Sequence, residues 1–136
     1  MLNAYSTAQT IPAGALVPFT SVALHKGMTA TLSGQNTIQL NRAGVYRVDL
    51  VLSGVPAAAG AVTVTMTKDG VPQPQATVTD PLAVTTIGVT LPVTTLVQVS
   101  RNNGSCCCRE PVVLAFELNG VGLNQAQASV VVTRIC

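Results

Sequence analysis

Charged residues are scarce in this chain. Lysine, arginine, aspartate and glutamate make up 9% of its 136 residues, whereas soluble globular domains usually carry about 25%. The seven basic residues are separated along the sequence, and the net charge is only +2. Because binding to nucleic acid depends on clustered cations that displace counterions from phosphates, the sequence predicts no nucleic-acid partner.

The chain also lacks a hydrophobic segment suited to a membrane. Its longest uncharged stretches, 50–67 and 81–100, contain proline and many threonines. They alternate with a period of two residues, which is typical of strands and not of membrane helices. The first ten residues have neither a basic region nor an apolar core, so no secretory signal peptide is predicted. We expect synthesis in the cytoplasm and no membrane insertion.

Side chains for catalysis or metal binding are few and scattered. His25 is the single histidine, and no G-x-S-x-G motif accompanies it. The five acidic residues are dispersed and form neither a paired-carboxylate motif nor a calcium-binding loop. The sequence therefore predicts a protein that is not an enzyme and holds no metal or cofactor, with His25 as an ordinary loop or surface residue.

Alternating β-strand patterns are abundant. Between residues 62 and 67, valine or methionine alternates with threonine. Asp69-Gly70 follows, and both residue types tolerate positive φ, which predicts a hairpin. Pro72 and Pro74 lie in the second strand of this hairpin. Since each proline removes one backbone donor, that strand is expected at the edge of a sheet.

The rest of the chain shows the same pattern. A short strand with Ile38 and Leu40 on one face precedes a turn at 41–44. The longer strand after the turn is predicted to alternate, with Tyr46, Val48, Leu50 and Leu52 inward and Arg47 and Asp49 outward. Further strands are predicted at 29–33, 83–90, 94–101, 112–118 and 129–135. Eight to ten short strands predict one all-β domain over residues 1–136, a two-sheet antiparallel sandwich or jelly roll, because a single open sheet would leave too many apolar faces exposed.

The segment NTIQLNRAGVYRVDLVLSG resembles the strand, turn and Gly-x-Tyr signature of the tumour necrosis factor and complement-type jelly-roll superfamily. Its signature positions here are Ile38, Leu40, Gly44, Tyr46 and Val48. The hairpin MTKDGVPQ and the closing ASVVVTRI are similar to the bacterial branch of that superfamily. This branch holds C-terminal domains of collagen-like spore-surface glycoproteins, exosporium basal-layer proteins and phage head-fibre or decoration proteins. The likeness extends over residues 4–135.

The resemblance implies a compact homotrimer displayed on the exterior of a spore, virion or cell. The expected function is structural: a subunit of a spore surface layer or appendage, or of a phage head decoration or fibre. Its partners would be its own copies and other surface or capsid proteins. The alternative is a soluble module that binds a carbohydrate or a host protein through its loops. Exposed aromatic residues on loops would mark this alternative, and the chain has no tryptophan.

The final strand, SVVVTRIC, is apolar on both faces. A strand of this kind lies in the centre of a sheet or at a subunit interface, and we expect some of each. Two alternating sets of side chains are candidates for the trimer interface: Val131, Thr133 and Ile135, or their neighbours Val130 and Val132.

The chain holds four cysteines, Cys106, Cys107, Cys108 and Cys136. Consecutive cysteines on an extended chain point to opposite sides and lack the usual spacing of zinc ligands. A disulfide between neighbours is disfavoured, because Cα atoms about 3.8 Å apart lie below the usual range of about 4.4–6.8 Å.

Three interpretations of the thiols stay open. They are free thiols or small apolar fillers, or they form cross-links within or between chains, or they bind a metal or cluster shared between subunits. Cytoplasmic synthesis is compatible with cross-linking, because spores and virions are released by lysis into more oxidising surroundings.

Overall fold

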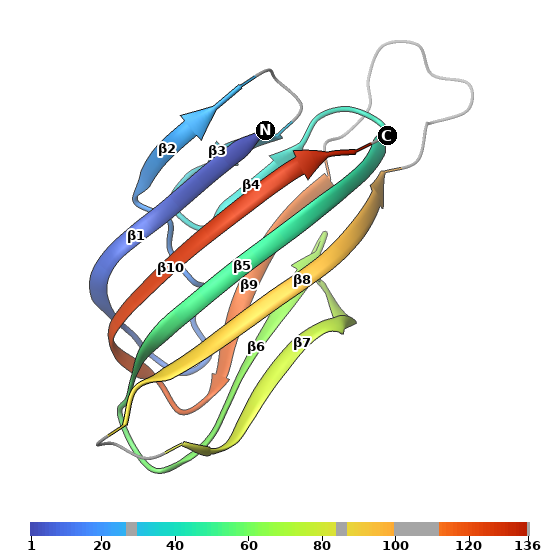
Figure 1. The fold of residues 1–136 in the computed structure, drawn as a ribbon. Helices are drawn as coiled ribbons and strands as arrows, with labels where there is room; N and C mark the ends of the chain where they lie inside the picture. Colours follow the sequence, from blue (N-terminus) through green and yellow to red (C-terminus); the bar gives the residue numbers. More distant parts are fainter. Residues whose placement is uncertain (27–29, 84–86, 100–111, 136) are drawn as a thin grey trace.

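The computed structural model describes residues 1–26, 30–83, 87–99 and 112–135. Within this part of the chain there are ten strands and no helix. The strands form two five-stranded sheets that pack face to face (Figure 1). Consistent with this, the described residues include no helix of the length and hydrophobicity needed to span a membrane.

The two sheets are purely antiparallel. Sheet A has the strand order β2-β1-β10-β5-β8, from β1 (Leu2–Ile11), β2 (Ser21–His25), β5 (Gly44–Pro56), β8 (Val89–Val99) and β10 (Leu123–Arg134). Sheet B has the order β3-β4-β9-β6-β7, from β3 (Ala30–Ser33), β4 (Thr37–Leu40), β6 (Gly60–Lys68), β7 (Val71–Ala83) and β9 (Val112–Gly120). Chain neighbours such as β4 and β5 lie in opposite sheets, which confirms the predicted jelly-roll sandwich.

The core lies between the sheets and contains four of the five signature positions of the resemblance, all but Gly44. Ile38, Leu40, Tyr46 and Val48 are fully buried, as their alternation predicted. The Tyr46 hydroxyl donates a hydrogen bond of 2.6 Å to the carbonyl oxygen of Arg42. This bond ties the start of β5 to the turn that leads the chain from one sheet to the other.

The predicted hairpin is confirmed. Asp69 and Gly70 have φ values of 52° and 83° and connect β6 to β7, and β7 is the edge strand of sheet B. A carboxylate oxygen of Asp69 accepts a 2.9 Å hydrogen bond from the backbone N–H of Val113. The turn is therefore attached to the beginning of β9.

Strands β1 and β2 were not predicted from the sequence. β1 buries Leu2, Ala4 and Ser6, and small or polar residues at buried positions weaken the alternation that marks a strand. His25 is the exposed last residue of β2, opposite Leu2, instead of lying in a turn. Without β1 as a pairing partner, the sequence around His25 gives no reason to expect a strand.

The predicted boundary between strands 83–90 and 94–101 was wrong within the described residues. β7 continues to Ala83, Ile87 and Gly88 are outside strands, and β8 runs unbroken from Val89 to Val99. Pro92 lies inside β8 and does not interrupt it, because β8 is an edge strand that pairs only with β5.

Candidate functional site

The outer face of sheet A, the side turned away from sheet B, is the candidate functional surface. Strand register aligns its side chains in rows that cross β1, β10, β5 and β8. One row joins Tyr5, Ser129, Val51 and Pro92, the next joins Asn3, Val131, Asp49 and Thr94, and a third joins Thr133, Arg47 and Leu96.

This face exposes several large apolar side chains. Tyr5 is 38% exposed, Val51 47% and Leu96 58%. Arg47 and Asp49 are the charged residues of the three rows, and their side chains pair at 3.1 Å between Nε and Oδ2. Apolar groups and mutually neutralised charges lower the cost of removing a surface from water.

The outer face of sheet B differs in chemistry. Here β6 and β7 present threonine hydroxyls that bond to one another, Thr63 to Thr79 at 2.9 Å and Thr77 to Thr65 at 3.3 Å. The large exposed apolar residue of sheet B is Val71, at the start of its edge strand. Sheet B thus presents a hydroxyl-rich face, and sheet A presents the more apolar one.

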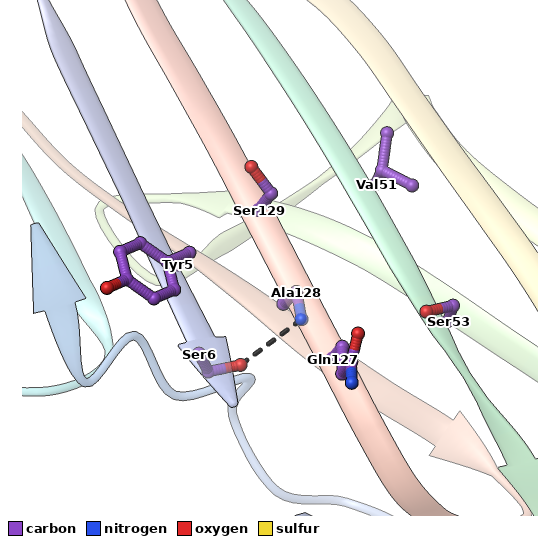
Figure 2. Close-up of a pocket in the computed structure, with 7 residues that line it drawn as sticks. All are labelled: Tyr5, Ser6, Val51, Ser53, Gln127, Ala128 and Ser129. Atoms are coloured by element: carbon purple, nitrogen blue, oxygen red, sulfur yellow. Dashed lines mark hydrogen bonds between the residues drawn. The ribbon is translucent and has the colours of Figure 1, made fainter. Parts of the chain in front are cut away.

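A hollow of about 290 Å³ lies on the outer face of sheet A (Figure 2). It lies where the ladder is irregular, between Ser6 and Gln9 on β1 and between Asn124 and Gln127 on β10. The Ser6 hydroxyl accepts a 3.2 Å hydrogen bond from the backbone N–H of Ala128. The lining residues combine one aromatic ring with hydroxyl and amide groups: Tyr5, Ser6, Val51, Ser53, Gln127, Ala128 and Ser129.

His25 and the acidic side chains are dispersed over the described part of the fold. The described residues contain no group of three or more histidine, cysteine or acidic side chains placed to hold a metal ion. The imidazole Nε2 of His25 lies 3.0 Å from the carbonyl oxygen of Ala30, an ordinary side-chain-to-backbone contact. His25 is thus accounted for as a surface residue at a strand end.

The structure separates the two predicted interface sets on β10. Val130 and Val132 are fully buried in the core between the sheets, so they have no surface to offer a partner chain. Val131 and Thr133 lie on the outer face of sheet A and are partly exposed, and Ile135 is 50% exposed. β10 is central in sheet A, between β1 and β5. Its apolar residues divide between the buried Val130 and Val132 on the inner side and Val131 on the outer side.

The four cysteines, Cys106, Cys107, Cys108 and Cys136, lie outside the described residues. The described residues that flank them lie at one end of the sandwich. Val99 pairs with Gly44 and Val112 pairs with Leu40, on either side of the turn between β4 and β5. The backbone N–H of Ile135 donates to the carbonyl oxygen of Val45 at 2.8 Å.

Sequence reasoning missed the residues that give the outer face of sheet A its character. Tyr5 lies on an unpredicted strand. Val51 has the same alternation as the outward Arg47 and Asp49, so an outward apolar residue was readable from the predicted strand. What the sequence did not supply was the pairing that aligns Val51 with Tyr5 and Ser129 across three strands.

No family model and no curated protein sequence matches the chain. Solved structures do. The globular domain of zebrafish complement 1qA superposes with a TM-score of 0.71 at 10% identity, covering 99% of this chain and 96% of that one. The PRD1 vertex protein P5 superposes with a TM-score of 0.67 at 17% identity, covering 99% of this chain and 96% of that one. Murine APRIL superposes with a TM-score of 0.67 at 5% identity, covering 95% of this chain and 97% of that one. The chain therefore has the tumour necrosis factor and complement-type jelly-roll fold.

Proposed function

We propose that this protein is a non-enzymatic structural subunit that assembles as a homotrimer through the outer face of sheet A. The observation that carries the proposal is the chemistry of that face: exposed Tyr5, Val51 and Leu96, and a charged pair that neutralises itself. Interface centres are depleted in unpaired charge and enriched in aromatic and apolar groups. The threonine-rich face of sheet B lacks these properties and is expected to face solvent.

Face-to-face packing suits this surface better than strand addition. Sheet A has two edge strands, β2 and β8. Pro92 in β8 has no N–H to donate to an added strand, and β2 is only five residues long, which limits the pairing it can offer. The apolar groups of the outer face of sheet A lie on three strands, β1, β5 and β8, so a partner must cover the sheet broadly to bury them. Val131 and Thr133 of β10, and Ile135 just after it, are expected in or beside this interface.

Display on an exterior surface is the second part of the proposal. It rests on the resemblance to spore-surface and phage decoration proteins, and its support is the similarity in fold to the PRD1 vertex protein P5. Other surface or capsid proteins would be the neighbours, on a spore surface layer or a virion. Antibody labelling of intact particles tests this, because an exterior subunit is labelled without disruption and an internal one is not.

Cross-linking through the cysteines is the third part. The flanking residues Val99, Val112 and Ile135 lie at one end of the sandwich, which favours a bond between Cys136 and the triplet, or between triplets of adjacent chains. After oxidation in air, a denaturing gel without reductant should show a change in migration that reductant reverses. Unchanged migration together with four titratable thiols would show that the cysteines are free thiols and that no cross-link forms.

Native mass spectrometry of the reduced protein at micromolar concentration tests the trimer directly. We expect a species of three times 13.9 kDa. A clean monomer under these conditions would overturn the proposed assembly, whatever the state of the cysteines.

Saccharide binding in the hollow is a second candidate function. Tyr5 beside the hydroxyls of Ser53 and Ser129 and the amide of Gln127 provides one stacking surface and several hydrogen-bonding groups. This site differs from the loop site expected from the sequence, because it lies on a sheet. A glycan array is the test: selective binding lost in Tyr5→Ala supports it, and no binding removes it.

A further inference from the structure

Basic residues that are far apart in the sequence converge at one end of the sandwich. Arg42, Lys68 and Arg134 belong to the β4–β5 turn, the end of β6 and the end of β10. We call this cluster the basic end. Figure 1 shows the β4–β5 connection beside the end of β10.

Hydrogen bonds to backbone carbonyls position two of these cations, Arg134 and Lys68. The guanidinium Nη2 of Arg134 donates to the carbonyl oxygen of Ala43 at 2.8 Å, beside Arg42 in the chain. The Nζ of Lys68 donates to the carbonyl oxygen of Gln98 at 3.0 Å. Gln98 pairs with Val45, two residues beyond Ala43. The three charges therefore surround a single turn.

Among the described residues, the cations of the basic end outnumber the carboxylates beside them. The ion pair of Arg47 with Asp49 lies elsewhere, on the outer face of sheet A. The nearby carboxylate is Asp69, which accepts the N–H of Val113 and offsets the charge of one of the three cations. Toward the other end of the sandwich, where β6 pairs with the end of β7, the charged residue is Asp80. Charge is therefore distributed unevenly along the sandwich.

Exposed apolar side chains adjoin these cations. Val71 pairs with Lys68 across the β6–β7 hairpin and is 60% exposed. Ile135 follows Arg134 and is 50% exposed. A surface that mixes cations with apolar groups suits a protein partner, which can supply both carboxylates and apolar contacts. A nucleic-acid backbone supplies only phosphates, and the aromatic Tyr46 near this end is fully buried, so no base can stack on it.

We propose that the basic end is a docking surface for a protein that presents carboxylate and apolar side chains together. Its three cations and Val71 lie away from the outer face of sheet A, and Ile135 is the one residue that also adjoins the proposed trimer interface. The proposal therefore does not depend on trimer formation, and the two can fail separately.

Binding to three polymers tests the proposal: a random copolymer of glutamate and tyrosine, poly-L-glutamate, and duplex DNA of mixed sequence. We expect the copolymer to bind most tightly, with an affinity that falls as salt is added. Replacing Arg42, Lys68 and Arg134 together by glutamine should weaken copolymer binding about tenfold, since exposed charge contacts contribute modestly and add up.

Single variants separate charge from apolar contact and guard against misfolding. Arg42→Glu changes a side chain for which no hydrogen bond is seen among the described residues, so the fold should persist while copolymer binding weakens. Val71→Thr keeps the side-chain shape but replaces a methyl group by a hydroxyl. It should weaken binding of the copolymer and leave binding of poly-L-glutamate unchanged. Lys26→Gln is the matched control, because Lys26 is an exposed cation that follows β2, at the opposite edge of sheet A from β8, and this variant should change the binding of neither polymer.

Three outcomes would overturn the proposal. They are absence of copolymer binding, equal binding by the triple variant and the parent protein, and tighter binding of duplex DNA than of the copolymer. The last would assign the basic end to nucleic acid instead of protein.

Discussion

Substitution of Val51 by lysine is the sharpest test of the proposed trimer. Val51 lies in the row between Ser129 and Pro92 and is 47% exposed in the isolated chain. A lysine here can extend its ammonium into water in a monomer, so the free energy of unfolding of one chain should change by about 0.5 kcal/mol or less. In a trimer that covers this face, each subunit would instead bury an unpaired ammonium.

The expected loss of association is large. Covering Val51 stabilises the assembly by about 1 kcal/mol per subunit, because roughly half of a valine side chain leaves water. Burying an unpaired charge costs several kcal/mol per ion, and about 4 kcal/mol already corresponds to roughly a thousandfold change in an equilibrium constant. Sedimentation equilibrium should therefore show a trimer for the parent protein and a monomer for Val51→Lys at micromolar concentration.

A matched control separates interface effects from general effects of charge. Val71 is also a valine, 60% exposed, but lies on β7 in sheet B. Val71→Lys should remain trimeric, and urea unfolding should show both variants folded. If Val51→Lys associates as tightly as the parent protein, the outer face of sheet A is not the interface and the reasoning fails.

Three further predictions concern the stability of one chain, measured by urea unfolding. Tyr46→Phe removes the hydroxyl that donates to the Arg42 carbonyl and should cost about 1–2 kcal/mol; no loss would mean that water replaces the bond. Phe116→Ala deletes a fully buried ring and should cost about 3–5 kcal/mol, and a smaller loss would indicate that the core collapses around the cavity. Gly120→Ala should lower the free energy of unfolding by more than about 2 kcal/mol, because φ is 88° and a Cβ would collide with a backbone carbonyl. Gly70→Ala should lower it by about 1 kcal/mol, because φ is 83° but the space around a Cβ is open. Equal losses at the two glycines would contradict this account.

The fold was predictable from the sequence because alternation is a local property. In β5 every second side chain from Tyr46 to Leu52 is buried, and the hydrophobic pattern alone fixes which face that is. The β6–β7 hairpin was predictable for a similar reason, since Asp69 and Gly70 adopt the positive φ that their residue types tolerate.

The missed elements are those whose pattern depends on partners. β1 buries Ala4 and Ser6, and neither residue is recognisable as a buried residue without the strands beside it. Pro92 lies between the predicted strands 83–90 and 94–101, and whether a proline ends a strand depends on whether that strand has one neighbour or two. Because β8 pairs on one side only, the missing donor costs nothing there.

By itself, the sequence determined the jelly-roll class, the core positions from Ile38 to Val48, and the scarcity of charge. Only the tertiary structure decided which side of β10 is surface, burying Val130 and Val132 and leaving Val131 on the outer face of sheet A. It also brought Arg42, Lys68 and Arg134 to one turn, although 26 and 66 positions separate them in the sequence. The physical reason is that side-chain alternation is set within a strand, whereas the neighbours of a side chain are set by antiparallel pairing between strands distant in the chain.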